Sequence, residues 1–212
     1  QPELESLSIW RDNVPTANAL SYLTNPWVGS TVSNNGADQK TVVGTISPET
    51  AAHLRFVDDA VAIRDRAVAM QKLAEDHITQ VHQPGEEVRW LSLASGTAEP
   101  SIKAANSSTE VNGVDVELTV VDYDGKALKF VQENAQKAGF EGTINTIQAN
   151  ILAEDLSTQL SNATGRSPQY DVVENMGFEE YLPQDGDELA AKKGASLPQA
   201  SEFTRRAYDM VK

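Results

Sequence analysis

Residues 116–128 read VELTVVDYDGKAL, and this stretch decides the fold. Its first six residues are mostly β-branched or aliphatic, which predicts a strand that ends at Asp122. Helical spacing follows over residues 126–137, and Gly139 stands where a glycine commonly ends a helix. Asp124 is placed to cap the start of that helix. A strand that leads directly into a helix is the repeating unit of a parallel α/β sheet.

The same alternation continues on both sides of this stretch. Strands are predicted at residues 88–93, 143–147 and 170–173, and helices after Pro100 and over residues 155–160. Alternating strands and helices predict an α/β fold, a parallel sheet with helices on both faces. Because ligands of such sheets bind at the carboxyl ends of the strands, the candidate site lies in the loops that follow the strands.

A helical N-terminal region is predicted before the sheet. The first 45 residues are rich in Asn, Ser, Thr, Pro and Gly, which favours short helices and loops. A long helix is predicted from Ser47 to about Ile78, followed by a turn signal at residues 83–85. We therefore divide the chain into a helical region or lid, residues 1–83, and a sheet domain, residues 84–212.

Composition excludes several functional classes. The chain has 212 residues, with 17 Lys and Arg against 31 Asp and Glu, and this net charge of −14 opposes nucleic-acid binding. It has no cysteine, so disulfides and thiolate chemistry are excluded, and its apolar runs fall far short of the roughly 20 residues that cross a bilayer. We expect a cytoplasmic protein without a membrane partner. His53, His77 and His82 precede the sheet without a metal-binding pattern, so we predict no metal site.

Three predicted loops carry candidate ligand-binding residues. Residues 94–100 have small side chains, so their backbone can approach a ligand closely and offer N–H groups to an oxygen acceptor. Asp122 ends a strand where a carboxylate can accept both hydroxyls of a ribose, although a solvated loop acid would look the same. Asn150 could hydrogen-bond an adenine edge, although loop asparagines as often form turns.

Together these segments resemble the class I S-adenosylmethionine-dependent methyltransferases, whose domain is Rossmann-like. Residues 91–100, LSLASGTAEP, resemble that family's glycine-rich first motif. Ala94 and Ala98 stand where glycines are usual, and Ser92 stands where the family has an acid that orients the cofactor's amino group. Alanine is tolerable at a glycine position if φ there is negative, although its methyl group could crowd the methionine part of the cofactor.

The later motifs follow in the same order and spacing. Residues 120–128, VVDYDGKAL, resemble the second motif, whose acid binds the cofactor ribose at the position of Asp122. Residues 148–150, QAN, resemble the third motif beside the adenine amine, and residues 170–178, YDVVENMGF, resemble the fourth strand and the loop that faces the methyl group. The cofactor-binding residues that the resemblance implies are Ala94, Ser95, Gly96, Thr97, Asp122, Tyr123, Asn150 and Asn175.

The resemblance implies S-adenosylmethionine as cofactor and methyl transfer to a small-molecule acceptor. Methyl transfer is an in-line displacement at a sulfonium, so the protein mainly positions the acceptor and excludes water. Glu174, at the end of the fourth strand, is the candidate catalytic base, or else an acid that fixes its loop by hydrogen bonds. Two alternatives stay open: a methyltransferase-like binding module without catalysis, and an NAD(P)-binding oxidoreductase, whose fingerprint needs more glycines.

The family's sheet normally has seven strands, and this sequence predicts four of them. Residues 203–212 read as a helix of the kind that leads into a fifth strand in the family. We therefore expect the sheet domain to be incomplete at Lys212. If the chain ends there naturally, the exposed edge of the fourth strand would need a partner, which favours a homo-oligomer or a complex.

Overall fold

The computed structural model describes residues 48–176, 178, 182 and 200–212. The loops and short helices expected in the first 45 residues lie outside this part of the chain. Two compact units divide the chain at Met70, and each is described by itself. No helix among the described residues is long and apolar enough to cross a membrane.

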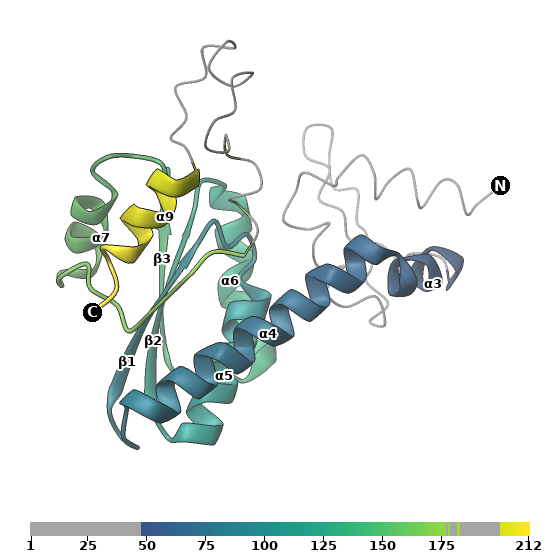
Figure 1. Cartoon of the computed structure of the whole chain (residues 1–212), viewed down its shortest axis with the longest axis horizontal. Helices are drawn as coiled ribbons and strands as arrows, with labels where there is room; N and C mark the ends of the chain where they lie inside the picture. The colour runs from purple at the N-terminus through teal and green to yellow at the C-terminus, as the bar shows by residue number, and fades with distance from the viewer. Residues whose placement is uncertain (1–47, 177, 179–181, 183–199) are drawn as a thin grey trace, which may run out of the picture. The chain divides into compact units, whose positions relative to one another are not determined.

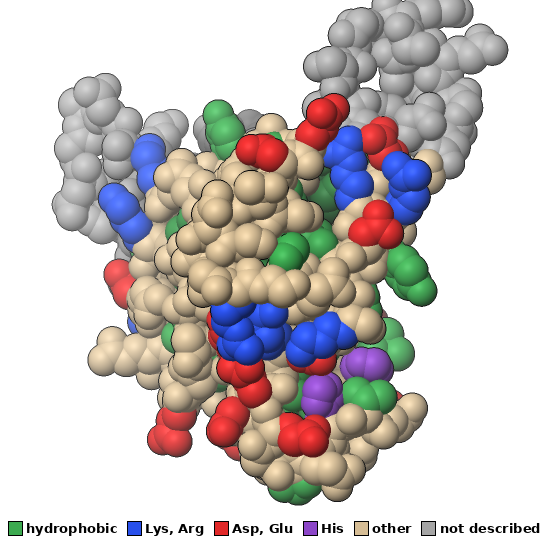
Figure 2. Space-filling model, turned by 90° about the vertical axis from the view of Figure 1, so that its left-hand side faces the viewer, with side chains coloured by type: hydrophobic (Ala, Val, Ile, Leu, Met, Phe, Trp, Pro, Cys, Tyr) green, Lys and Arg blue, Asp and Glu red, His purple; other side chains and the backbone are tan. Residues whose placement is uncertain are grey.

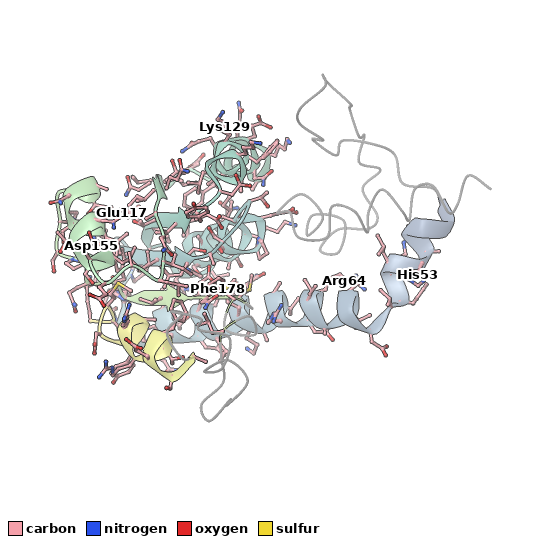
Figure 3. The ribbon with its side chains drawn as sticks, turned by 90° about the horizontal axis from the view of Figure 1, so that it is seen from above. His53, Arg64, Glu117, Lys129, Asp155 and Phe178 are labelled. Atoms are coloured by element: carbon pink, nitrogen blue, oxygen red, sulfur yellow. The ribbon has the colours of Figure 1, made fainter. Side chains whose placement is uncertain are left out.

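The single long helix predicted before the sheet is wrong, because the structure has two helices there. They are α3, Pro48–Phe56, and α4, Asp58–Val81. Arg64, which is labelled on α4 in Figure 3, donates hydrogen bonds to the backbone carbonyls of Leu54 and Arg55. In an uninterrupted helix these carbonyls would accept backbone N–H groups, so the guanidinium satisfies the end of α3 where the helix breaks.

The predicted parallel sheet is confirmed. Its strands are parallel throughout and lie in the order β3-β2-β1-β4 (Figure 1). They are β1, Glu87–Leu93, β2, Asp115–Asp122, β3, Thr143–Gln148, and β4, Val172–Glu174. The helices that connect them are α5, Glu99–Asn112, α6, Gly125–Ala138, α7, Leu156–Thr164, and α9, Ala200–Tyr208. This strand order is that of a Rossmann-like α/β fold, with β1 at its centre.

The helices cover both faces of the sheet. Helices α5 and α6 lie on one face, and α7 and α9 lie on the other (Figure 1). Side chains of β1 point alternately to these two layers. Trp90 lies in the α5 and α6 layer, and Leu91 belongs to the opposite core with Leu160 of α7 and Phe203 of α9; all four side chains are buried. Burial on both faces explains why β1 and β2 are rich in apolar residues.

A cluster of charged side chains closes the amino end of the sheet. Arg89 is only 3% exposed; it donates to the backbone carbonyls of Ser167 and Gln169, at 2.8 and 2.6 Å, and lies over the ring of Tyr170. Its Nε lies 3.4 Å from Oε2 of Glu117, which is labelled in Figure 3. On the face shown in Figure 2, Lys and Arg side chains lie directly beside Asp and Glu side chains. The cluster ties β1 and β2 to the segment before β4.

The predicted helix over residues 203–212 is partly wrong, because α9 ends at Tyr208. The N–H of Tyr170 donates to the carbonyl of Met210 at 2.8 Å, and the N–H of Lys212 donates to the carbonyl of Tyr170 at 2.9 Å. These bonds form a parallel bridge between Tyr170 and Val211. Residues 210–212 therefore lie along the segment that leads into β4, as strand neighbours rather than as a helical turn.

Candidate functional site

The sheet has a topological switch point between β1 and β4. From β1 the chain proceeds to β2 and β3 on one side, and it returns to β4 on the other side. The connections after β1 and β4 therefore leave in opposite directions, and ligands of open α/β sheets bind in the crevice that results. Loop 94–98 and Glu174, the last residue of β4, both lie at this crevice.

Loop 94–98 has an unusual backbone. Ala94, Gly96 and Ala98 have φ values of 51°, 56° and 52°, so every second residue is in the left-handed region. The condition under which alanine replaces glycine without strain, a negative φ, is therefore not met at Ala94 or Ala98. An L-residue in this conformation carries a strain of roughly 1–2 kcal/mol. The loop thus keeps a shape that glycine favours even though two of its three positive-φ positions are alanines.

Relief of this strain gives a testable prediction. Ala94→Gly should raise the free energy of unfolding by about 0.5–1 kcal/mol, which is the strain less the extra entropy of glycine in the unfolded chain. Ala98 is a poorer choice because its methyl group is fully buried. The matched control is Ala163→Gly in α7, which should lower stability by about 0.5–1 kcal/mol. Urea unfolding of the two variants checks the opposite signs, and a loss for both would contradict the strain.

Asp122 joins the second strand to this loop. Its Oδ2 accepts the N–H of Gly96, and its Oδ1 accepts the N–H of Asp124, both at 2.8 Å. Ser95 adds a longer backbone bond, from its N–H to the carbonyl of Val121, at 3.4 Å. The side chain of Asp124 accepts the N–H of Lys126, which confirms the predicted helix cap. Since a carboxylate has about four lone-pair positions, Asp122 retains two for further donors.

The other predicted cofactor residues lie along the same edge of the sheet. Tyr123 follows Asp122 and is 77% exposed, so its ring is open to a ligand. Asn150 is exposed, and its Oδ1 accepts the N–H of Leu152. It therefore forms a local turn, which we expected from sequence as the alternative to a hydrogen bond with adenine. Thr97 is buried, and its carbonyl accepts a bond from Asn134 of α6. Loop 94–98 and Asp122 are therefore in direct contact, whereas Tyr123 and Asn150 flank them.

Asn175 follows β4 at this edge. Its Oδ1 accepts the N–H of Phe178, which is labelled in Figure 3, at 3.2 Å. The ring of Phe178 packs against Phe203, with centroids 5.6 Å apart. Its Nδ2 is buried and has no hydrogen-bond partner among the described residues. Since unpaired buried donors are rare, this amide is a donor that a ligand could use.

Glu174 lies in a hydroxyl network that the sequence did not indicate. The register pairs Ser92 of β1 with Glu174 of β4. Ser101, in the first turn of α5, donates to Oε1 of Glu174 at 2.5 Å, and its oxygen lies 3.1 Å from the oxygen of Ser92. The hydroxyls of Ser92 and Ser101 and the carboxylate of Glu174 therefore form one buried network. Burial raises the pKa of Glu174, and the hydroxyls of Ser101 and Ser92 oppose that increase.

The raised pKa makes stability depend on pH. Above 4.5, the ordinary value for this carboxyl, the unfolded chain loses a proton that folded Glu174 retains. The contribution of this group therefore destabilises the fold increasingly as pH rises through that range. We expect Glu174→Gln to be more stable than the wild type at pH 7 and to lose that advantage near pH 4.5. Unfolding at several pH values measures it, with Glu110→Gln, an exposed site, as control; equal curves would contradict the shift.

A small cavity lies elsewhere on this edge. It has a volume of about 100 Å³ and lies between α7 and α9, beneath the ends of β1 and β3. Leu93, Ile151, Phe203 and Met210 form much of its apolar wall. None of the predicted cofactor residues lines it, so it is separate from the contact between Asp122 and loop 94–98.

The chain is similar to several proteins of known structure. No protein-family model matches the chain, and no curated protein matches it. A solved structure of a possible exported protein from Bordetella parapertussis is 17% identical, with 86% of this chain and 53% of that chain covered and a TM-score of 0.54. A SAM-dependent methyltransferase from Geobacter sulfurreducens, in complex with S-adenosyl-L-homocysteine, is 13% identical, with coverages of 68% and 44% and a TM-score of 0.37.

A third solved structure, an S-adenosyl-L-homocysteine-bound methyltransferase from Podospora anserina, is 15% identical, with 66% of this chain and 52% of that chain covered and a TM-score of 0.39. This chain spans about half the length of these three proteins. The Bordetella protein shares the fold, so this arrangement of strands and helices also occurs in a solved structure.

Proposed function

We propose that this chain binds S-adenosylmethionine at the carboxyl edge of its sheet and serves methyl transfer to a small-molecule acceptor. The observation that carries the proposal is the bond between the Asp122 carboxylate and the N–H of Gly96. It joins a strand-end acid suited to a ribose with a loop that has the left-handed backbone of a glycine-rich turn. The order of the four resembling segments along the sequence supports the same reading.

The residues present fit such a cofactor. Asp122 has lone pairs left for two ribose hydroxyls, and Tyr123 offers an exposed ring beside it. The small side chains at positions 94–98 let the backbone approach the ligand, while the buried Nδ2 of Asn175 offers a donor at the end of β4. These groups come from β1, β2 and β4, which meet around the switch point.

The chemistry asks little of the side chains. When bound, S-adenosylmethionine supplies a methyl group on a positively charged sulfur, which makes the methyl carbon open to attack. Asp122 and loop 94–98 would hold the ribose and the neighbouring part of the ligand at the crevice between β1 and β4. An acceptor in that crevice would be held in line with the bond that breaks. The acidic chain, with a net charge of −14, favours a small molecule over nucleic acid as this acceptor.

Isothermal titration calorimetry tests the proposal. Wild-type protein titrated with S-adenosylhomocysteine should give saturable one-site binding, and titration with NAD should give none. Binding of NAD alone would replace the proposal with an oxidoreductase. Absence of binding to either ligand would overturn it in favour of a module that binds no such cofactor.

A further inference from the structure

Glu174 differs from two other buried carboxylates of the sheet domain, Glu117 and Asp171, and also from Asp122, whose two oxygens accept backbone N–H groups. Glu117 faces Arg166 at 2.6 Å, and Asp171 faces Lys212 at 2.9 Å. Glu174 has only hydroxyl partners among the described residues, and no cation. A carboxylate removed from water without a positive partner is unfavourable, which is why burial raises its pKa. Such a group is suited to a positively charged part of a ligand.

We propose that Glu174 holds the α-ammonium group of the amino-acid part of bound S-adenosylmethionine. This inference rests on the proposed function, because the ammonium belongs to that ligand. In this proposal Glu174 anchors the ligand, which we call the anchor role, and does not act as a general base.

The position of Glu174 supports this role. It is in register with Ser92, and the chain leaves β1 after Leu93 to form loop 94–98. The carboxylate therefore lies at the base of the loop, beside β1. Asp122, at the other side of the loop, contacts the N–H of Gly96. A ligand whose ribose is held by Asp122 would extend its amino-acid part across the loop toward Glu174.

The hydrogen bonds of Glu174 favour one group of the ligand over the others. Ser101 donates to Oε1, which orients the carboxylate, and a carboxylate has about four lone-pair positions, so Glu174 can accept further donors. A sulfonium has a positive charge but no N–H donor, while the adenine amine and the ribose hydroxyls are donors without charge. The ammonium alone combines charge with N–H donors, and charge-assisted bonds are the stronger class.

The same bonds disfavour the catalytic base. A base must receive a proton from the acceptor and release it to water in each turnover. The partners of Glu174 are Ser92 and Ser101, which are 0% and 2% exposed, so its hydrogen bonds lead into the core rather than to solvent.

The test compares two ligands on one variant. Glu174→Gln keeps the shape of the side chain and removes its charge. We expect its affinity for S-adenosylhomocysteine, measured by calorimetry, to fall about tenfold or more, in line with the strength of a hydrogen bond to a charged group. Affinity for the deaminated analogue, which lacks only the amino group, should stay within about twofold of wild type. The control Glu110→Gln should bind both ligands as the wild type does.

A second-site variant separates charge from local shape. Glu174→Gln combined with Ser92→Asp places a carboxylate on the facing strand, and it should recover most of the lost affinity for S-adenosylhomocysteine. Ser101→Ala removes the hydroxyl that orients the carboxylate and should weaken the same ligand by a smaller factor. Thermal unfolding confirms that each variant is folded, and Ser101→Ala provides the test if Glu174→Gln is not.

Each result decides between the two proposals. If Glu174→Gln lost equal affinity for S-adenosylhomocysteine and for the deaminated analogue, the anchor role would be overturned, since Glu174 would then only shape the loop. Unchanged affinity in Glu174→Gln, with wild-type binding intact, would overturn the anchor and leave the proposed function standing. Absence of binding by the wild-type protein would overturn the proposed function and the anchor with it.

Discussion

Replacing Asp122 with alanine should weaken the binding of S-adenosylhomocysteine at least about tenfold, because hydrogen bonds to a charged group contribute roughly 1.5–3 kcal/mol each. The substitution removes the acceptor for two ribose hydroxyls. It also releases the N–H groups of Gly96 and Asp124, so loop 94–98 loses its bond to β2. Titration calorimetry on folded protein measures the change in affinity.

Two further variants define what the Asp122 result means. Asp115→Ala changes the same residue type at the exposed start of β2, at the opposite end of the strand, and should bind as the wild type does. Asp122→Asn retains one acceptor oxygen and should fall between wild type and alanine. If Asp122→Ala bound with unchanged affinity, the ribose would have to lie elsewhere.

The largest effect on stability is expected from Arg89→Met. Arg89 is nearly fully buried, and its removal leaves the carbonyls of Ser167 and Gln169 without their donor and Glu117 without one of its two cations. Breaking a buried charge pair on one side destabilises proteins by about 3–5 kcal/mol, so we expect a loss of about 3 kcal/mol or more. Urea unfolding followed by tryptophan fluorescence suits this measurement, because Trp90 is the next residue and is buried.

Controls for Arg89→Met separate burial from charge. Lys103→Met removes an exposed partner of Glu99 on α5 and should change stability by less than about 0.5 kcal/mol. The double variant Arg89→Met, Glu117→Gln removes both charges of the pair and should recover part of the loss through their coupling. A single variant as stable as the wild type would show that the cluster does not stabilise the amino end of the sheet.

The sheet could be predicted from sequence because its signals are local. β2 and α6 follow from a β-branched run, a capping Asp124 and a terminal Gly139, and each of these acts within a few residues. The break between α3 and α4 could not be predicted in this way. It depends on Arg64 reaching carbonyls nine and ten residues earlier, and helical spacing carries no sign of that contact.

Long-range contacts limited the prediction of the site in the same way. The network of Glu174, Ser101 and Ser92 joins residues up to 82 positions apart through strand register, which only the folded sheet defines. The positive φ values of Ala94 and Ala98 were missed because alanine predicts the opposite conformation. Strand pairing and loop closure impose this backbone on the residues, so the resemblance to a glycine-rich motif was a better guide than propensity.

The bonds made by Tyr170, Met210 and Lys212 have a consequence for amide hydrogen exchange. They join Tyr170, just before β4, to residues 210–212, which follow α9, through one parallel bridge at the amino end of the sheet. The amide of Tyr170, a fully buried residue, should exchange more slowly than the loop amide of Ser95, whose 3.4 Å bond should open locally. This weakly bonded amide of Ser95 lies at the edge where a ligand would enter, so a bound ligand should slow its exchange.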